Sequence, residues 1–177
     1  MRHVLASGAA LPYPVLERLR VCLPAGATVH SVYGATEALP ISMIGHHELL
    51  PLRPVTTSGS GVCPERPLPG VTVRVLPLDP VPSGRLGTVG EPAVAGPNVS
   101  PAYLDGTVGR ASEPHDREGG HLHRMGDAGR LDEQGRIWFH GRIAHRVRTA
   151  AGDVRGCCST RRCPWTIATA PSPTACG

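Results

Sequence analysis

The sequence predicts an α/β unit followed by a β-rich part, and three observations support this fold class. Residues 4–6 form a short apolar run that leads into a turn of small residues. Leucines then recur at spacings of three and four, which is the period of an amphipathic helix. Further along, Val71, Val73 and Val75 alternate with polar residues, as in a strand with one buried face.

The first predicted unit is β-α-β and occupies residues 1–45. Its helix is expected to open at the prolines of positions 12 and 14 and to stop at Pro24, and its buried face is formed by Leu16, Leu19 and Leu23. A second strand is predicted over residues 28–33, where apolar and polar residues alternate. This pattern is typical of one unit of an α/β sheet.

The second predicted unit, residues 60–140, consists mostly of short strands separated by Gly and Pro. Residues 58–69 are rich in Gly, Pro and Ser and are expected to form a loop. Strands are predicted over 71–75, 87–95 and 136–140, and residues 129–140 as a hairpin. A small distorted β-barrel or an open sheet fits this pattern. From residue 154 to residue 177 neither a helix nor a strand period is present, so an irregular tail is expected.

Composition excludes several classes of function. All 18 basic side chains are arginine, so chemistry that needs a lysine cannot occur on this chain. The net charge is +4, and basic residues do not cluster with aromatic ones, which argues against a nucleic-acid binder. No apolar run is long enough for a membrane span, and no secretory signal is evident. We therefore expect a cytoplasmic protein whose six cysteines are reduced.

Three short motifs, each beside a predicted strand, suggest a nucleotide site. They are the YGATE sequence of residues 33–37, the RMGD sequence of residues 124–127, and the pair Gly141-Arg142. An aromatic ring can cover adenine, a hydroxyl and a carboxylate can meet phosphate and Mg²⁺, and an aspartate can accept bonds from two ribose hydroxyls. Taken alone, each motif is also compatible with an ordinary strand end or turn.

With their flanking residues, these motifs resemble the adenylate-forming superfamily of acyl-CoA synthetases, luciferases and peptide-synthetase adenylation domains. The segments that carry the resemblance are 29–40, 123–127 and 141–147. It extends over about residues 4–153. Within the superfamily, the chain resembles the β-lactone synthetases of bacterial olefin biosynthesis. The resemblance implies that residues 1–140 are the C-terminal part of a large AMP-binding domain, and that residues 141–153 are a hinge leading into a small C-terminal domain.

The resemblance also implies roles for single residues. Tyr33 would cover adenine, with Gly34 and Ala35 beside it. Asp127 would bind both ribose hydroxyls with help from Arg142. The small-residue turn that would lie on the other side of the base is Gly8, Ala9 and Ala10.

Two further residues are implied as catalytic. Thr36 would hydrogen-bond the phosphates, and Glu37 would hold the Mg²⁺ ion. Adenylation joins two anions, so it depends on charge neutralisation and in-line positioning more than on a strong base.

The chain departs from the superfamily in ways that favour a fragment. The Gly/Ser/Thr-rich phosphate loop and the catalytic lysine of the superfamily have no counterpart in it. Pro92 falls on a predicted strand, where it would remove a ladder donor. The Cys- and Arg-rich sequence after Asp153 resembles translation in a wrong reading frame. We therefore expect a gene fragment with a frameshifted end.

Three interpretations of function remain open at this point. The first is a fragment of an ATP-dependent, AMP-forming ligase that adenylates a fatty or β-hydroxy fatty acid, leading to a β-lactone or, with coenzyme A, to a thioester. The parent protein would use ATP, Mg²⁺ and a carboxylic acid, and could associate with other enzymes of the olefin pathway. The alternatives are a non-catalytic nucleotide-binding remnant and a pseudogene product without function.

Other candidate ligands carry weaker signals. His121 and His123 could place two imidazoles on one side of a strand, with His115 or Asp116 as a third metal ligand, although a plain loop is the simpler interpretation. The pair at positions 46 and 47 is expected at the surface. The cysteines at 157, 158 and 163 lack the Cys-x-x-Cys spacing of a zinc site.

Overall fold

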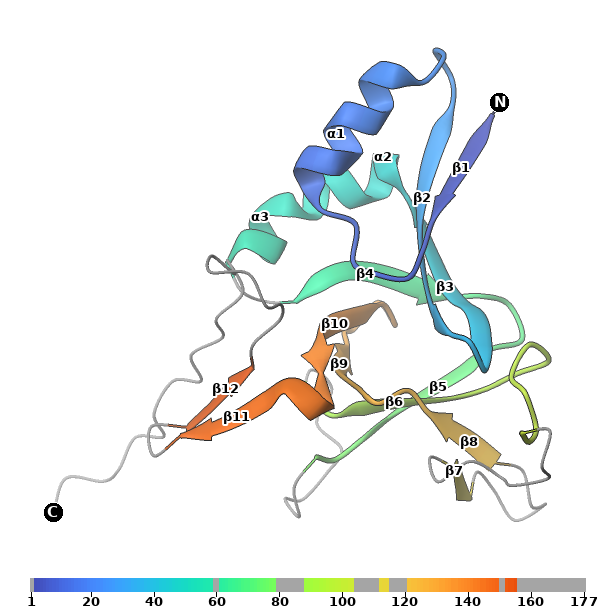
Figure 1. Cartoon of the computed structure of the whole chain (residues 1–177), viewed down its shortest axis with the longest axis vertical. Helices are drawn as coiled ribbons and strands as arrows, with labels where there is room; N and C mark the ends of the chain where they lie inside the picture. The colour runs from blue at the N-terminus through green and yellow to red at the C-terminus, as the bar shows by residue number, and fades with distance from the viewer. Residues whose placement is uncertain are drawn as a thin grey trace, which may run out of the picture.

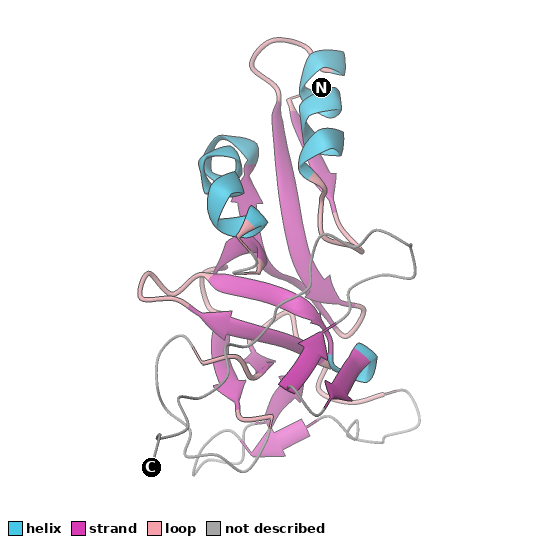
Figure 2. Cartoon of the chain, turned by 90° about the vertical axis from the view of Figure 1, so that its left-hand side faces the viewer, coloured by secondary structure: helices cyan, strands magenta, loops and turns pink. Residues whose placement is uncertain are grey.

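The computed structural model describes residues 2–58, 61–78, 88–103, 112–114, 121–149 and 152–155. Strands dominate it, and the α-helices gather at one end of the molecule (Figures 1 and 2). The main sheet has six strands in the order β1-β2-β3-β4-β10-β9, and a second sheet has the order β5-β6-β8-β7. The strand β11 pairs with β12 in a separate hairpin.

The predicted β-α-β unit is confirmed. The strand β1 (His3–Ala6) runs parallel to β2 (Thr28–Ala35), and α1 (Tyr13–Cys22) connects them. Leu16 is fully buried, and Leu19 and Leu23 are partly buried against the same cluster, as the leucine spacing predicts. The side chains of this first core come mainly from β1, α1, β2 and the helical segment after β3, and Ile44 of β3 and Val62 of β4 complete it.

The strand β3 (Ala38–Gly45) and the helices after it were not predicted. These are α2 (His46–Leu49), a 3₁₀ turn (Leu50–Leu52) and α3 (Arg53–Thr57). The expectation of two surface histidines is wrong for His46, which is only 3 % exposed. Its Nδ1 accepts a hydrogen bond from the backbone N–H of Val29 at 3.1 Å, which attaches α2 to the start of β2.

The loop predicted over residues 58–69 is also incorrect, because β4 (Val62–Pro67) occupies most of it. This strand pairs with β3 on one side and β10 on the other. Its register opposite β3 places Ser42 beside Pro67, so the main sheet runs without interruption from the β-α-β unit into the β-rich part. Gly61 lies directly before β4 and Pro67 is its last residue, so the Gly and Pro residues of this segment bound a strand and do not exclude one.

The strands predicted further along are found. They are β5 (Thr72–Leu76), β6 (Glu91–Ala95), and the hairpin of β9 (Asp127–Leu131) and β10 (Ile137–Arg142); β7 (Ser112–Pro114) and β8 (His121–Arg124) complete the second sheet. Pro92 sits within β6, where it is buried and its carbonyl accepts the N–H of Met125 at 3.0 Å.

A closed barrel is not formed by the described strands, so the predicted small barrel is replaced by open sheets. The two edges of the main sheet are β1 and β9. They do not meet, because β1 lies beside β2 at the helical end of the molecule, away from the hairpin (Figure 1). An isolated bridge links β9 to the residue before β6, where Gly90 and Gly129 exchange two backbone hydrogen bonds of 2.8 Å.

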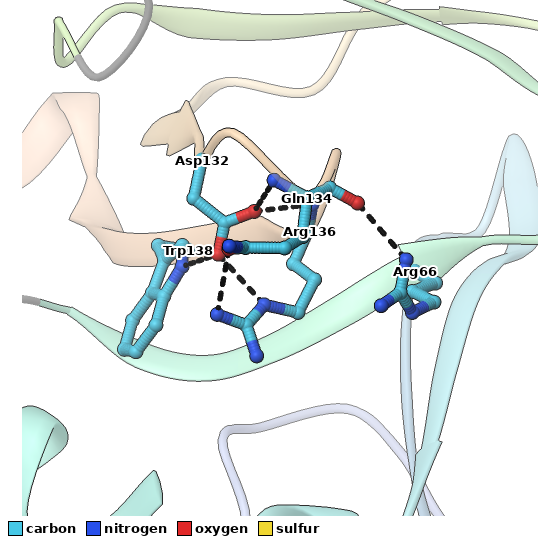
Figure 3. Close-up of polar contacts among 5 residues, drawn as sticks. All are labelled: Arg66, Asp132, Gln134, Arg136 and Trp138. Atoms are coloured by element: carbon cyan, nitrogen blue, oxygen red, sulfur yellow. Dashed lines mark hydrogen bonds and ion pairs between the residues drawn. The ribbon is translucent and has the colours of Figure 1, made fainter.

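A polar network centred on Asp132 locks the turn of the β9–β10 hairpin (Figure 3). Its carboxylate accepts bonds from the backbone N–H groups of Gln134 and Arg136, from the Arg136 Nε at 2.7 Å, and from the indole N–H of Trp138 at 2.8 Å. Arg66 on β4 donates to the carbonyl of Gln134 at 2.9 Å. The hairpin that carries Asp127 and Arg142 is thereby attached to β4.

The end of the described chain is a short helical turn, Ile143–His145, followed by β11 (Arg146–Thr149) and β12 (Gly152–Arg155). Residues 154 and 155, which were expected to be irregular, belong to β12. The rest of the predicted irregular tail lies outside the described residues. No helix among the described residues is long and apolar enough to cross a membrane.

Candidate nucleotide site

The structure brings together three of the residues that the motifs single out. The phenol O–H of Tyr33, on β2, donates to Asp127 Oδ2 at 2.8 Å. The Nη1 of Arg142 lies 3.1 Å from the other carboxylate oxygen, Oδ1. Asp127 and Arg142 are cross-strand partners in the β9–β10 hairpin. The sheet also brings Tyr33 next to Asp127, although the two residues are 94 positions apart in the sequence. The main sheet thus builds one cluster from three strands.

Burial sets the electrostatics of this cluster. Asp127 is 3 % exposed, and burial raises the pKa of its carboxyl group, against the opposing effects of the Tyr33 hydrogen bond and the Arg142 charge. Burial also raises the pKa of the Tyr33 phenol well above its usual range, and the Asp127 charge adds to this. The phenol therefore stays protonated and remains a hydrogen-bond donor to the carboxylate.

One oxygen of Asp127 is incompletely satisfied. Arg142 approaches Oδ1 closely, but the alignment is not that of a hydrogen bond, and its Nη1 donates to the Met125 carbonyl at 3.3 Å. A buried carboxylate oxygen without a hydrogen-bond donor is unusual, because buried polar atoms are nearly always paired. This oxygen therefore keeps an unused capacity to accept a hydrogen bond.

The loop that presents Asp127 is held by Glu91, a residue that the sequence analysis did not identify. Its Oε1 accepts the backbone N–H of Gly126 at 3.1 Å, and its Oε2 accepts the Arg124 Nε at 2.8 Å. A further bond joins the N–H of Ile143 to the Gly126 carbonyl at 3.0 Å. Glu91 is 4 % exposed, and a lone acid at the start of an apolar strand was the available signal.

The other motif residues, Thr36 and Glu37, form the two-residue turn between β2 and β3, where Ala35 pairs with Ala38. Gly34 is required here for steric reasons. A Cβ at this position would lie 2.5 Å from the Ala38 carbonyl oxygen, which no side chain could accommodate without moving the backbone. Thr36 is exposed and Glu37 is half-buried, so both can be reached from solvent at the strand end next to Tyr33.

Glu37 is positioned by the segment after β6 and does not contact the Tyr33–Asp127 pair. Its backbone carbonyl accepts the Ser100 N–H at 2.7 Å, and its Oε1 accepts the Tyr103 hydroxyl at 2.9 Å. Hydrogen bonding from its own backbone N–H and from Tyr103 lowers the pKa of the carboxyl group. An ionised, half-exposed carboxylate fits the hard-ligand chemistry of Mg²⁺. Tyr103 was missed because nothing near it in the sequence marks a site.

The small-residue turn of Gly8, Ala9 and Ala10 follows β1 at the same edge of the sheet. Ala6, the last residue of β1, is in register with Ser31 on β2. Gly8 follows Ala6 by two residues, and Tyr33 follows Ser31 by two residues. Gly8 and Ala9 are exposed, and Ala10 packs against the first core. The carboxyl ends of neighbouring parallel strands are where α/β sheets bind ligands. The roles of these residues toward a nucleotide stay predictions.

The histidine pair on β8 gains no support as a metal site. Among the residues that the structure describes, no group of three or more His, Cys, Asp or Glu side chains could hold a metal ion. The other candidate ligands, His115 and Asp116, and the cysteines at 157, 158 and 163 lie outside the described residues.

Comparison with curated proteins gives relatives of related chemistry. The chain is 36 % identical over 170 residues to an olefin beta-lactone synthetase of Xanthomonas campestris pv. campestris, covering 87 % of this chain and 30 % of that protein. It is 30 % identical over 159 residues to the L-proline--[L-prolyl-carrier protein] ligase of Streptomyces coelicolor, covering 84 % of this chain and 26 % of that ligase. The chain thus spans less than a third of the length of these relatives.

Solved structures agree on the fold. The O-succinylbenzoate coenzyme A synthetase of Bacillus subtilis in complex with ATP and magnesium matches with a TM-score of 0.64, covering 87 % of this chain and 29 % of that one. At 22 % identity, this likeness concerns the fold alone. VinN is 35 % identical with a TM-score of 0.59, and the match covers 80 % of this chain and 33 % of VinN.

The family comparison covers more than half of the sequence. Residues 1–104 match the family described as AMP-binding enzyme. This segment contains the YGATE motif, the small-residue turn and Glu91, and the structure joins it to Asp127 and Arg142. The chain therefore belongs to the AMP-binding enzymes of the adenylate-forming superfamily.

Proposed function

We propose that this chain forms the adenosine-binding part of an ATP-dependent, AMP-forming ligase that activates a carboxylic acid. The observation that carries the proposal is the buried Asp127, which receives the Tyr33 phenol on one oxygen and leaves the other without a hydrogen-bond donor. Two ribose hydroxyls are donors of the kind that such a carboxylate lacks. Arg142, opposite Asp127 on β10, balances the charge of the carboxylate.

Each of the remaining site residues would contact a different part of the nucleotide. The Tyr33 ring would cover one side of adenine, with Gly34 and Ala35 next to it, and the turn after β1 would approach the base from the other side. Thr36 would donate to the phosphates, and Glu37 would hold Mg²⁺. The metal would neutralise phosphate charge during attack of the carboxylate on the α-phosphorus, as pyrophosphate leaves.

The proposed substrate is a fatty or β-hydroxy fatty acid. Support comes from the olefin beta-lactone synthetase among the relatives, although the chain spans only 30 % of that protein. With a 3-hydroxy acid, attack of the hydroxyl on the acyl-adenylate would close a β-lactone and release AMP. With coenzyme A, a thioester would form instead. Association with other enzymes of olefin synthesis is part of the same proposal.

The proposed division of the chain follows from this function. Residues 1–140 would be part of the AMP-binding domain, and residues 141–153 would be a hinge and the start of a small domain. The hairpin of β11 and β12 lies in this second segment. Residues 154–177 would be a tail read in another frame, although its first two residues pair in β12.

Calorimetric titration of AMP tests nucleotide binding by the 177-residue chain. We expect Asp127→Ala to weaken binding by about tenfold or more, because hydrogen bonds to a charged group contribute about 1.5–3 kcal/mol. Glu133→Ala is the control, since Glu133 also carries a carboxylate but is exposed at the far turn of the hairpin. Equal heats for the wild type and Asp127→Ala would refute the site.

A second candidate function is nucleotide binding without turnover. It is favoured by the complete absence of lysine from the chain. We expect the isolated chain to bind AMP but to catalyse no detectable exchange of pyrophosphate into ATP in the presence of a 3-hydroxy acid. Robust exchange by the purified chain would contradict this expectation.

A further inference from the structure

Beneath the proposed nucleotide site lies a second buried acid, Glu65, to which neither the motifs nor the family comparison assigns a role. It belongs to β4 and is only 1 % exposed. A carboxyl group this deep in a sheet is costly, because it loses its hydration. Such groups need donors around them, and the identity of those donors indicates their role.

The donors to Glu65 come from β3, which pairs with β4, and from β2, the next strand of the sheet. The Ser42 hydroxyl, on β3, donates to Oε2 at 2.9 Å. On β2, the Ser31 hydroxyl and the backbone N–H of Tyr33 approach the carboxyl group and as donors lower its pKa, against the larger effect of burial, which raises it. Ser42 is the cross-strand partner of Tyr33, and Ser31 precedes Tyr33 by two residues on the same face of β2. The carboxyl group therefore contacts the segment of β2 that carries the Tyr33 ring.

From Glu65 a continuous series of contacts leads to the ribose-binding acid. Its carboxyl group holds the backbone of Tyr33, and the Tyr33 hydroxyl donates to Asp127 at 2.8 Å. The β2–β3 ladder loses its regular register just beyond this point, between Tyr33 and Ala35. The backbone N–H of Tyr33 thus lies where the ladder is about to break and is fixed by a side chain instead.

We propose that Glu65 is a positioning residue of the nucleotide site, which sets the orientation of Tyr33 through its backbone N–H and the hydroxyls of Ser31 and Ser42. The inference rests on the proposed function, since it concerns how the same site is held. A core acid that merely joined strands would act on stability and leave nucleotide affinity in the folded protein unchanged.

The test compares two substitutions of similar size in the full chain. Glu65→Gln keeps one carbonyl oxygen that can accept from Tyr33 N–H or Ser42, whereas Glu65→Leu keeps no acceptor. We expect Glu65→Gln to bind AMP within about twofold of the wild type, and Glu65→Leu to bind about tenfold more weakly, because a buried N–H loses its partner. The matched control is Glu133→Gln at the exposed turn. Equal affinity of Glu65→Leu and the wild type would overturn the proposal.

A spectroscopic measurement separates this inference from nucleotide binding itself. The chain contains three tyrosines, so ¹³C-labelled tyrosine gives three ring signals, and Tyr33→Phe identifies the one that matters. We expect Glu65→Leu to shift the Tyr33 signal and Glu65→Gln to leave it near its original position. An unshifted signal in Glu65→Leu would overturn the positioning role.

The positioning role of Glu65 can still be tested in two further cases. If the wild type binds no AMP, the proposed function fails, and the Tyr33 signal alone then decides whether Glu65 positions the ring. If Glu65→Leu does not fold, Ser42→Ala takes its place, since it removes one of the three donors. We expect Ser42→Ala to shift the Tyr33 signal and to weaken AMP binding by about threefold; no change in either would count against the proposal.

Discussion

Asp127 and Glu65 are two buried acids of one sheet, and their surroundings assign them different tasks. Asp127 faces the Tyr33 phenol and Arg142 and keeps one oxygen without a donor. Glu65 is surrounded by hydroxyls and a backbone N–H from β3 and β2. The first arrangement leaves one acceptor atom without a donor, as the proposed nucleotide site requires, whereas the second surrounds the carboxyl group with donors of the protein.

Removal of the Tyr33 hydroxyl should destabilise the protein. In Tyr33→Phe, the buried Asp127 carboxylate loses its only aligned side-chain donor among the described contacts. We expect a loss of about 1–3 kcal/mol at pH 7, measured by urea unfolding. The loss should diminish at low pH, where Asp127 is protonated. Tyr103→Phe is the control, because Tyr103 is half exposed.

The pH dependence of stability should reveal Glu65. Burial raises the pKa of its carboxyl group from 4.5 to about 7. Because the folded chain holds this proton more tightly than the unfolded chain, the contribution is complete below pH 4.5 and is lost as the pH rises to 7. The expected loss is about 3 kcal/mol, and Glu65→Gln should remove it. Wild-type and Glu65→Gln stabilities that run parallel from pH 4.5 to 8 would contradict the assignment.

At the scale of elements, the β9–β10 hairpin depends on Asp132. One carboxylate accepts bonds from the backbone N–H groups of Gln134 and Arg136 and from the side chains of Arg136 and Trp138 (Figure 3). The guanidinium of Arg130 lies 4.9 Å from the centre of the Trp138 ring. The Trp138 side chain thus makes both a cation–π contact with Arg130 and a hydrogen bond to Asp132.

Loss of this network should open the hairpin locally. We expect Asp132→Ala to cost about 2 kcal/mol and to accelerate amide hydrogen exchange in residues 127–142 more than in α1. Glu133→Ala, at the next position, removes a carboxylate that is exposed at the turn and should leave exchange unchanged. Uniform acceleration over the whole chain would show that the hairpin is not an independent unit.

Periodicity identified α1, β1, β2, β5 and the β9–β10 hairpin because each carries its own repeating pattern. It failed for β4, whose residues 62–67 include two prolines and gain strand geometry only between β3 and β10. For the site, the motifs located Tyr33, Asp127 and Arg142. They could not locate Glu65 or Glu91, because these acids act through contacts with strands that are distant in sequence.

At the scale of the whole molecule, the described residues form two cores joined by the main sheet. The first packs α1 and the helices after β3 against β1 and β2, and the second lies where β3, β6 and β10 meet. Tyr33 packs at the edge of the second core, and Val29 on the same strand belongs to the first core. The sheet thus connects the helical end of the molecule with the proposed site.

Leu16 tests whether the first core is required for stability. It is fully buried, so Leu16→Ala should cost about 2–5 kcal/mol through lost contacts and a cavity. The control is Val21→Ala on the same helix, because Val21 is 87 % exposed and its change should cost less than about 0.5 kcal/mol. Urea unfolding followed by circular dichroism measures both. Similar stabilities of the two variants would show that α1 is not packed as described.

The most direct measurement compares AMP with 2′,3′-dideoxy-AMP on the wild type and on Asp127→Ala. If Asp127 accepts the ribose hydroxyls, removing them from the ligand should weaken binding to the wild type by about tenfold or more and should leave binding to Asp127→Ala nearly unchanged. The same loss of affinity in both proteins would mean that this buried acid does not hold the sugar.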